Sequence, residues 1–367
     1  MKIGILTFQT TNNYGAILQS YALQYVLKEF GHCPETIDYR CEYISKPYRF
    51  KNLKNKGVAG YLFSLIGYIC YLPRTKSSNQ FRKYLRYSRP YSSEDLFRVG
   101  NDYDMYIVGS DQVWNYRLTN GDMHYLLDFV EDDRKKFSYA ASIGVSEITG
   151  KLVENYQKLL HQFHMISVRE KQGAEIVFGL TGRKAEVVLD PTLLLSAKEW
   201  LRVAKLPQIK EKYILVYQLG ISKKLIKFTK NLSKKTGLKV IYIPFPLGGV
   251  LKATCQWHIG PAEWLGLFYK ASYIVTDSFH GTVFSILFNK QFYTEASGQH
   301  KGVGSRLFNL LSTFQLTERF IDNNMLLDAD DTVDYEFVNK ILEKERKASM
   351  EFLQSILDAT YERNERI

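Results

Sequence analysis

The chain contains little cysteine and tryptophan, and no hydrophobic run long enough to span a membrane. Its 367 residues include 4 Cys and 4 Trp. The cysteines are widely spaced without a CxxC pair, so the sequence predicts reduced thiols in a cytoplasmic protein and no disulfide framework. The longest apolar stretch, at 58–72, holds 15 residues, whereas a transmembrane helix needs roughly 20. The N-terminus lacks the apolar core and cleavage site of a signal peptide, and we expect none.

Motifs for nucleotides, metals and nucleic acids are also missing. No GxGxxG and no Walker lysine follows the first apolar segment, which argues against a dinucleotide-dependent dehydrogenase and a nucleoside-triphosphate hydrolase. The seven histidines form no HExxH pattern. His161 and His164 share a helix face without a third ligand nearby in the sequence, so we predict no metal site. No nucleic-acid-binding motif accompanies the basic residues, and we expect no nucleic-acid partner.

The composition that is present indicates a folded protein with an unusual aromatic content. Hydrophobic residues make up 45% and charged residues 24% of the chain, which are ordinary globular values. The aromatic share is 14%, with 26 Tyr and 22 Phe. Tyrosine-rich surfaces suit half-polar partners such as sugars, nucleotides or membrane interfaces. At roughly 100–200 residues per domain, the length predicts two domains.

The positive charge is concentrated in one segment. The whole chain carries a formal net charge of +11. Residues 40–90 hold twelve Lys or Arg and a single acidic residue, whereas the rest of the chain holds 37 residues of each sign. We therefore interpret the protein as a neutral scaffold with one basic module at 40–90.

Two interpretations of this basic module stay open. In the first, Tyr61, Tyr68 and Tyr71 lie at the headgroups of an anionic inner leaflet, and the flanking basic residues attract the protein to that membrane. In the second, the apolar stretch at 58–72 is a core helix and the charges are solvated. The first interpretation makes the protein peripheral on the inner face of the plasma membrane.

Short apolar segments alternate with amphipathic helical segments, which is the pattern of a parallel sheet covered by helices. The sequence therefore predicts an α/β fold with two Rossmann-like domains facing a cleft. We expect an N-terminal domain at 1–204, a C-terminal domain at 205–334 and an amphipathic helix at 335–367. The predicted strands are 3–7, 105–108, 137–141, 165–168, 186–189, 213–218, 239–244, 273–276 and 291–293, and the predicted helices are 15–30, 222–236, 261–269, 281–288 and 335–363.

Ligands of open parallel sheets bind beyond the carboxyl ends of the strands, and the loop TDSFHG at 276–281 is the most informative of these ends. His280 would lie at a helix N-terminus, where exposed N–H groups favour a phosphate or carboxylate. An imidazole there can transfer protons near neutral pH, and Gly281 would let a ligand approach the backbone. Alternatively, Asp277 and Ser278 only cap the helix and His280 packs.

The loop GSDQVWN at 109–115 follows the predicted strand at 105–108. Ser110 and Gln112 offer polar groups there, Asp111 could orient or deprotonate a hydroxyl, and Trp114 could stack on a sugar ring. Helix capping by Ser110 or Asp111, with Trp114 in the core, explains the same residues equally well.

Two further loops contain candidate binding residues. Asn13 and Gly15 lie in a turn between the first strand and its helix, and a simple turn explains them as well. Arg169, in the SVRE segment at 167–170, ends another strand. Its guanidinium suits two-point binding of a carboxylate or phosphate, although a single arginine more often forms a surface ion pair.

These segments together resemble the polysaccharide pyruvyl transferase family. The resemblance covers about residues 3–320, and GSDQVWN and DSFHG are specific in combination. It is carried, in the family's order, by NYGAILQ at 13–19, GSDQVWN at 109–115, YAASIG at 139–144, SVRE at 167–170, LDPT at 189–192, TDSFHG at 276–281 and SRLFNLL at 305–311.

The resemblance implies two Rossmann-like domains of the GT-B type and transfer of the enolpyruvyl unit of phosphoenolpyruvate to two hydroxyls of a sugar. It implies that His280 is the catalytic histidine and that Arg169 binds phosphoenolpyruvate. Family members often carry an arginine two residues before the histidine, where this chain has Ser278. Either Arg306 supplies the missing cation or the donor differs. The reaction requires no metal or redox cofactor.

We therefore expect a ketal-pyruvyltransferase of capsule or exopolysaccharide biosynthesis that uses phosphoenolpyruvate and a sugar or lipid-linked oligosaccharide acceptor. Two alternatives stay open: a GT-B glycosyltransferase that uses a nucleotide-sugar, and a non-catalytic glycan-binding assembly protein. The expected site residues are His280 and Asp111 for catalysis, Arg169, Ser278, Gly281 and Arg306 for phosphoenolpyruvate, and Asn13, Gly15, Ser110, Gln112 and Trp114 for the acceptor.

Overall fold

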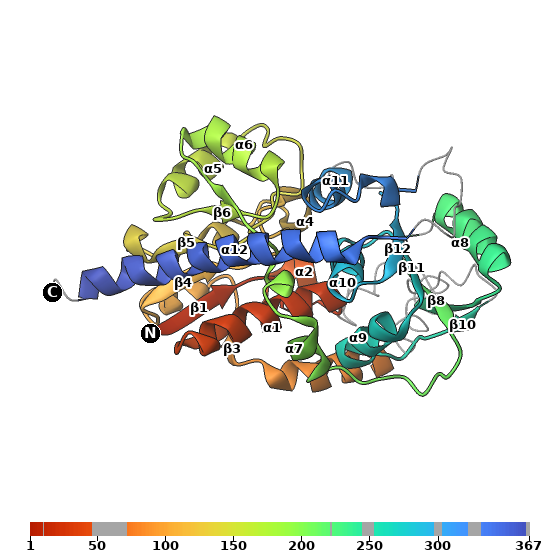
Figure 1. Ribbon diagram of the computed structural model, residues 1–367. Coiled ribbons are helices and arrows are strands. Elements are labelled where there is room, and N and C mark those ends of the chain that lie inside the picture. Colours follow the sequence, from red (N-terminus) through yellow and green to blue (C-terminus); the bar gives the residue numbers. More distant parts are fainter. Residues whose placement is uncertain are drawn as a thin grey trace, which may run out of the picture. The chain divides into compact units, whose positions relative to one another are not determined.

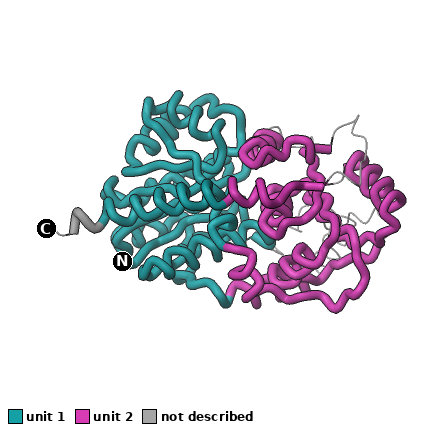
Figure 2. Tube along the Cα trace, viewed as in Figure 1, with its two compact units in different colours: residues 1–49, 83–195, 343–367 teal, residues 50–82, 196–342 magenta. Residues whose placement is uncertain are grey.

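The computed structural model describes residues 1–9, 11–45, 72–220, 222–243, 253–296, 303–321 and 332–364. The chain divides into two compact units, which Figure 2 distinguishes by colour. Unit 1 consists of residues 1–49, 83–195 and 343–367, and unit 2 consists of residues 50–82 and 196–342. The central part of the predicted basic module, residues 46–71, lies outside the described residues.

Unit 1 is built on a five-stranded parallel sheet with the order β3-β2-β1-β4-β5, and Figure 1 labels its elements. The strands are β1 (Lys2–Leu6), β2 (Cys33–Tyr39), β3 (Tyr87–Tyr91), β4 (Met105–Val108) and β5 (Lys136–Ser138). Two short strands, β6 (Ser167–Val168) and β7 (Glu186–Val187), form a further parallel pair. Single bridges join the β5 segment to the β6 segment. A central β1 with strands added on both sides is the Rossmann-like order.

The connections of unit 1 are helical. Its helices are α1 (Tyr14–Glu29), α2 (Glu42–Ser45), α4 (Tyr116–Thr119), α5 (Leu152–His161) and α6 (Lys171–Thr181), with 3-10 turns η3 (Arg82–Tyr84, at the boundary with unit 2), η4 (Leu96–Val99), η5 (Met123–Leu126), η6 (Asp133–Lys135) and η7 (Pro191–Leu193). α1 begins at the cap Asn13, whose side chain accepts from Gly15 N. The chain leaves it through Gly31, whose φ of 82° suits glycine.

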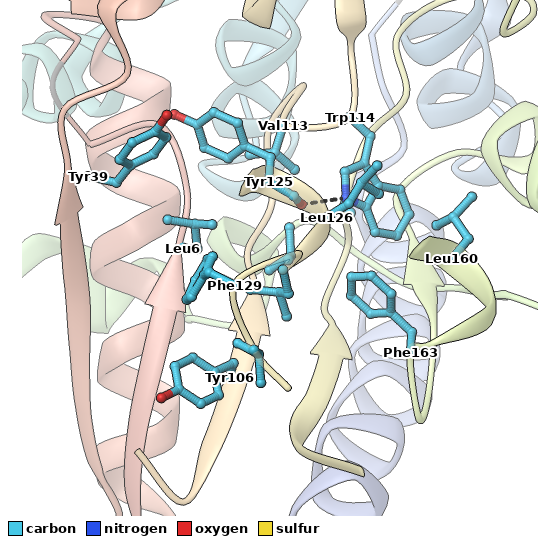
Figure 3. Packing of buried hydrophobic residues seen from close by; sticks show 14 of the residues in the cluster. Leu6, Tyr39, Tyr106, Val113, Trp114, Tyr125, Leu126, Phe129, Leu160 and Phe163 are labelled. Atoms are coloured by element: carbon cyan, nitrogen blue, oxygen red, sulfur yellow. Dashed lines mark hydrogen bonds between the residues drawn. The ribbon is translucent and has the colours of Figure 1, made fainter. Parts of the chain in front are cut away.

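The core of unit 1 is strongly aromatic (Figure 3). The Trp114 indole N–H donates to Tyr125 O at 2.9 Å, and its ring meets Phe163 edge-on at 5.6 Å. Each buried side chain of this size contributes on the order of 2–3 kcal/mol. Across both units, eight tyrosines are among the largest fully buried side chains. Much of the aromatic content therefore lies in the interior. Fewer of the tyrosines than expected are available to form binding surfaces.

Unit 2 repeats the architecture with the order β10-β9-β8-β11-β12, again all parallel. The strands are β8 (Tyr213–Tyr217), β9 (Lys239–Ile243), β10 (Thr254–Cys255), β11 (Tyr273–Thr276) and β12 (Gln291–Thr294). The helical elements are α7 (Ala197–Leu201), α8 (Lys223–Thr236), α9 (Pro261–Lys270), α10 (Phe279–Leu287), α11 (Val303–Thr313) and the 3-10 turn η8 (Thr317–Arg319). The predicted α/β fold of two Rossmann-like halves is confirmed.

The described ends of the basic module belong to different units. Residues 72–81 are helical, and Ser77 packs so closely against Gly260 that a Cβ there would lie 2.7 Å from the Ser77 Cβ. By contrast, residues 87–91 form β3, the edge strand of the sheet in unit 1. Pro90 is compatible with an edge strand, because its missing N–H can face outward. The two described ends of the segment at 40–90 are therefore built into different units.

The C-terminal helix α12 (Tyr335–Asn364) is confirmed and has 30 residues. Within unit 1, Ser349 Oγ accepts from Leu189 N at 2.9 Å, and Arg346 Nε donates to Leu193 O at 2.7 Å. The helix is therefore part of the structure of unit 1 from residue 343 onward. In the described ranges, none of the helices combines the length and apolar character that crossing a bilayer demands.

Candidate active site

The carboxyl ends of three strands lie next to one another in unit 2. Tyr217 of β8 pairs with Thr276 of β11, which in turn pairs with Thr294 of β12. The residues that follow these partners are Gln218, Asp277 and Glu295. All three are buried polar residues, and they mark the edge at which open parallel sheets bind ligands.

His280 lies at this edge, in the first turn of α10. The Ser278 hydroxyl caps the helix by accepting from Gly281 N at 3.2 Å, and a hydroxyl that accepts in this way can also donate its own hydrogen. His280 is 6% exposed, and its ring lies edge-on to Phe279 at 5.3 Å. The first N–H groups of a helix and its dipole favour an anion at this position. The imidazole of His280 therefore lies at a helix end that favours an anion.

Gly281 has a packing role that the sequence interpretation did not anticipate. A Cβ at this position would lie 2.5 Å from Thr276 Oγ1, which is closer than any real Cβ contact. The Thr276 hydroxyl itself donates to Tyr217 O at 2.7 Å. Glycine is therefore required because α10 packs tightly on β11, whether or not a ligand approaches the backbone here.

Asp277 secures the loop between β8 and α8. Its carboxylate accepts from Leu219 N at 2.7 Å and from Gly220 N at 3.1 Å. Burial raises the pKa of Asp277 from 3.8 to about 6, although the backbone N–H groups favour the charged form, and the nearby Glu295 raises it further. The side chain is therefore both a loop clamp and an acid that titrates close to neutrality.

Glu295 holds the same loop from the neighbouring strand. The Ser222 hydroxyl donates to Glu295 Oε2 and accepts from Leu225 N at 3.1 Å. Ser222 is the N-cap of α8, so Glu295 fixes the cap, and with it the start of the helix. Asp277 and Glu295 together set the position of the β8–α8 connection beside α10.

Gln218 contributes a buried donor at this edge. Its Oε1 accepts from the Tyr242 hydroxyl at 2.9 Å, and burial, helped by Asp277, raises the pKa of Tyr242 to about 12. In the part of the chain that the structure describes, Gln218 Nε2 has no hydrogen-bond partner although the residue is 1% exposed. An unsatisfied buried donor costs about 1–3 kcal/mol, so this amide is a natural partner for an oxygen of a bound molecule.

Arg306 belongs to the same unit as His280. It lies on α11, which contacts α10, and it is 5% exposed. Arg306 is therefore a buried cation on a helix that contacts the helix bearing the histidine.

Arg169, in unit 1, forms a buried ion pair. Its Nη1 lies 2.8 Å from Asp190 Oδ2, and the two side chains are 2% and 0% exposed. Asp190 Oδ1 accepts from the Thr192 backbone and hydroxyl at 3.0 and 2.6 Å. The sequence analysis allowed a surface ion pair for Arg169. The ion pair exists, but it is buried. Asp190 fixes the guanidinium in one orientation.

The motifs of unit 1 meet around this pair. Ser110 Oγ donates to Asp190 Oδ2 at 2.8 Å, which joins GSDQVWN to LDPT. Glu170 Oε1 accepts from Ser142 Oγ at 2.9 Å and from Ile143 N at 3.1 Å, which joins SVRE to YAASIG. Four segments that are distant in the sequence thus form one buried polar network.

Asp111 and Gln112 occupy the turn that follows β4. Asp111 has a φ of 80°, in the left-handed region that aspartate tolerates better than most residues. Its Oδ1 accepts from Gln112 N at 2.8 Å, and Gln112 Oε1 accepts from Asn115 Nδ2 at 2.9 Å. Asp111 is 8% exposed, so its carboxylate is chiefly part of the turn.

Three residues predicted to bind the acceptor have roles in packing or helix capping. Trp114 is fully buried, so its indole belongs to the core, as the alternative interpretation held, and sugar stacking is not carried further. Asn13 caps α1, and Gly15 is buried in the first turn of that helix. The predicted residues thus form two groups, one in each unit: Ser110 and Arg169 lie together in unit 1, and Ser278, His280, Gly281 and Arg306 lie together in unit 2.

The sequence interpretation missed five polar residues. A signal existed for three of them, because each lies at the carboxyl end of a predicted strand, which is the rule that singled out His280. Asp190 follows the predicted strand 186–189, Gln218 ends the predicted strand 213–218, and Glu295 comes two residues after the predicted strand 291–293. For Glu170 and Ser222 the signal was their proximity to a motif or a helix start. Among the described residues, no group of three or more His, Cys, Asp or Glu side chains could hold a metal ion.

Two solved structures of similar fold illustrate the comparison with known proteins. A UDP-GlcNAc 2-epimerase from Neisseria meningitidis, bound to UDP-GlcNAc, has a TM-score of 0.49 and 11% identity over 97% of this chain and 99% of that chain. A glycosyltransferase from Streptomyces sp. SF2575 has a TM-score of 0.46 and 10% identity over 97% and 99%. No curated protein matches the chain.

The family model of the polysaccharide pyruvyl transferases matches residues 13–297. This range contains the buried polar network of unit 1 and the edge of unit 2 that bears His280. The protein therefore belongs to the polysaccharide pyruvyl transferase family and is a transferase that acts on a donor and a sugar acceptor.

Proposed function

We propose that this transferase moves the enolpyruvyl group of phosphoenolpyruvate onto two hydroxyls of a sugar, forming a cyclic pyruvate ketal during surface-polysaccharide synthesis in the cytoplasm. Membership in the family supports the reaction class. The observation that carries the proposal is His280 at the N-terminus of α10, because the reaction needs one proton donor beside an anionic donor substrate.

The reaction balances without a metal or a redox cofactor. The methylene carbon C3 of phosphoenolpyruvate accepts a proton and becomes a methyl group, which leaves cationic character at C2. One sugar hydroxyl then bonds to C2 and loses its proton. The C2–O bond to phosphate breaks, phosphate leaves, and the second hydroxyl closes the ketal as it loses its own proton. The sugar thus loses two protons, of which one equals the proton now on C3 and the other leaves with phosphate or solvent.

In this proposal His280 delivers the proton to C3. An acid or base positioned in this way typically contributes 10²- to 10⁴-fold to a rate. His280 is suited to the role because α10 begins at the edge where its N–H groups favour the phosphate or carboxylate of the donor. Asp277 holds the adjacent loop and supports this arrangement as a positioning residue.

The donor anion needs cations and hydrogen-bond donors, and in unit 2 we propose Gln218 Nε2 and Arg306 for this purpose. Separately, Arg169 of unit 1 stays our proposed phosphoenolpyruvate-binding arginine. Ser278 stays among the proposed donor-binding residues, because a hydroxyl that accepts from Gly281 N can also donate its own hydrogen to an anion. Arg306, buried on the helix that contacts α10, is our candidate for the cation that many family members carry at the position of Ser278. Arg169 is already oriented by Asp190, and preorganised arginines suit two-point anion binding.

For the acceptor we propose Asp111 and Gln112, at the turn after β4, as the hydroxyl-orienting groups, with Asn13, Gly15 and Ser110 from neighbouring loop ends of unit 1. A sugar carried on a lipid is our proposed acceptor form. Residues 40–90 remain our proposed contact with an anionic inner leaflet, although most of that segment lies outside the described residues.

The central experiment measures phosphate release from phosphoenolpyruvate with and without a glycan acceptor. We expect release only when both substrates are present. His280→Ala should lower kcat by about 10²- to 10⁴-fold. His258→Ala is the matched control, since His258 is exposed in the same unit, and it should retain activity within twofold. Full activity of His280→Ala would remove the assignment of this residue.

A second measurement separates phosphoenolpyruvate from a nucleotide-sugar as the donor. Thermal-shift titration should show stabilisation by phosphoenolpyruvate and none by nucleotide-sugars, because a ligand that binds only the folded state raises the melting temperature. Gln218→Glu keeps an oxygen that accepts from the Tyr242 hydroxyl and replaces the amide donor with a second acceptor, so it should weaken this stabilisation. Release of a nucleoside diphosphate from a nucleotide-sugar would contradict the proposal.

A further inference from the structure

Helix α8 of unit 2 carries charge of one sign only. Its 14 residues include six lysines and no acidic residue. Four of these lysines lie on exposed positions at helical spacing, and we call them the α8 lysine face: Lys223, Lys227, Lys230 and Lys234. The opposite face of the helix packs into the core of unit 2 through Leu225, Phe228 and Leu232. The charged side is therefore the outer side, and Figure 1 shows α8 outside strands β8 and β11.

Among the described residues, no acidic side chain forms an ion pair with the α8 lysine face. In the described ranges, the ion pairs of unit 2 involve other basic residues, and none involves this face. Helix α12 shows the usual alternative, because its Lys340 pairs with Glu336 and its Lys347 with Glu351, each at i,i+4 spacing. The two helices thus differ: these exposed lysines of α12 have acidic partners on the same helix, and the α8 lysine face has none on α8.

The arrangement is electrostatically unfavourable for α8 by itself. Lysines four residues apart repel one another along the face. Lys223 and Lys224 also occupy the first turn, where the helix dipole disfavours cations, while Asp and Glu are absent from that turn. An external surface of negative charge would turn each of these unfavourable terms into a favourable one.

We propose that the α8 lysine face docks unit 2 onto an anionic lipid surface. The four ammonium groups span about 16 Å along one side of the helix, and lysine stems are long and flexible enough to follow mobile headgroups. Lysine binds as a point charge, whereas fixed two-point recognition of a defined anion favours arginine. The apolar face of α8 is already buried, so contact takes place through charge at the surface, without insertion.

The charge balance of the unit supports this partner. Unit 2 contains 25 basic and 12 acidic residues, whereas unit 1 contains 24 basic and 26 acidic residues. Juxtamembrane lysines are attracted to the negative potential of an anionic leaflet and lose this attraction in high salt. α8 and α10 both begin at the carboxyl edge of the same parallel sheet, so docking through α8 would hold the His280 edge near the lipid surface.

The test uses the full-length protein and sedimentation with phosphatidylcholine vesicles that contain or lack 30% phosphatidylglycerol. One variant replaces the α8 lysine face with Gln (K223Q, K227Q, K230Q and K234Q together). The matched control removes four exposed lysines of unit 1 (K28Q, K151Q, K158Q and K344Q together). Both variants change the net charge equally, and all eight side chains are exposed, so both should fold.

We expect the unmodified protein to bind only the anionic vesicles at 50 mM salt and to be released at 500 mM. The α8 variant should bind at least tenfold more weakly, and the unit 1 control should stay within twofold of the unmodified protein. Equal binding by the α8 variant, no binding by the unmodified protein, or binding to a soluble acidic polysaccharide in place of vesicles would each overturn the proposal. Phosphate release with a soluble acceptor should be unchanged in the α8 variant, so the test stands apart from the proposed reaction.

Discussion

The two units share one architecture and differ in how they use charge. Each has a parallel sheet with its first strand in the centre. Unit 1 is close to neutral, and its arginine and carboxylates meet inside the fold. Unit 2 has twice as many basic as acidic residues, and its buried carboxylates bind N–H and O–H groups. Net charge thus varies freely on one fold, because the fold depends on burial and strand pairing.

The interior of unit 1 should be more sensitive to the loss of one charge than any other part of the molecule. Asp190→Asn would remove the nearer counter-charge of the buried Arg169 guanidinium and leave only Glu170, 4.0 Å from Arg169 Nε, and we expect a loss of about 3–5 kcal/mol of unfolding free energy. Urea denaturation measures this loss. Glu186→Gln is the control, because Glu186 pairs with Lys184 on the surface and should matter by no more than about 0.5 kcal/mol.

A combined replacement sharpens this prediction. Arg169→Met combined with Asp190→Leu and Glu170→Gln removes all three charges of this buried group and should recover most of the stability that Asp190→Asn loses, since none of the three leaves an unpaired charge. A loss below about 1 kcal/mol for Asp190→Asn would show that the ion pair is not what holds the network together.

In unit 2, a buried carboxylate is bound by the Ser222 hydroxyl in place of an arginine. Ser222→Ala removes a helix cap, worth about 1 kcal/mol, and takes a donor from the buried Glu295 carboxylate, worth about 1 kcal/mol more. We expect a total loss of about 2 kcal/mol by urea denaturation. Asn13→Ala, which removes only the cap of α1 in unit 1, should lose about half as much. Equal losses would mean that the contact with Glu295 adds nothing.

Unit 2 should also respond to pH through Asp277. Its pKa in the folded state, about 6, lies above the usual 3.8 because of burial, so the fold favours the protonated form. The resulting stability is present at low pH and is lost as pH rises through about 6. Relative to Asp277→Asn, the unmodified protein should lose about 1 kcal/mol between pH 5 and pH 7.5. Urea denaturation at both values measures the difference, and parallel pH dependence of the two proteins would contradict it.

The smallest expected effect is the change in stability when one surface lysine is removed, and its sign should differ between the two units. Lys347→Gln removes an attractive i,i+4 pair in unit 1 and should lower stability by about 0.3 kcal/mol. Lys227→Gln relieves repulsion within the α8 lysine face and should raise stability by about the same amount. Replicate urea titrations resolve the sign. A loss of stability in both variants would mean that the lysines of α8 do not repel one another appreciably.

Sequence periodicity predicted the parts of the fold with the clearest apolar patterns. The strands β4 and β11 begin and end as predicted, because each is a short apolar run between polar loops. The strands β2 and β3 were missed. Their sequences, CPETIDY and YSRPY, contain proline and charged residues, and only pairing with β1 and β2 makes them strands. Local propensity is weak where sheet neighbours decide.

The candidate site divides in the same way. The rule that ligands meet the carboxyl ends of strands led from the sequence to His280, Asp111 and Arg169. The sequence could not show that Arg169 is locked by Asp190, that the Ser278 hydroxyl caps α10, or that Trp114 is fully buried. Each of these facts depends on a partner that is remote in the sequence or on the packing of neighbouring elements.

The sequence by itself determined the fold class, the two Rossmann-like halves, the C-terminal helix and the family, since these follow from periodicity and from short contiguous motifs. Tertiary structure alone decided how the charge is distributed. It assigned residues 72–82 to unit 2 and β3 to unit 1, and it placed the lysines of α8 on an outer face. The physical reason is that a side chain's charge is local to the sequence, whereas its burial, its partner and its pKa are set by what packs around it.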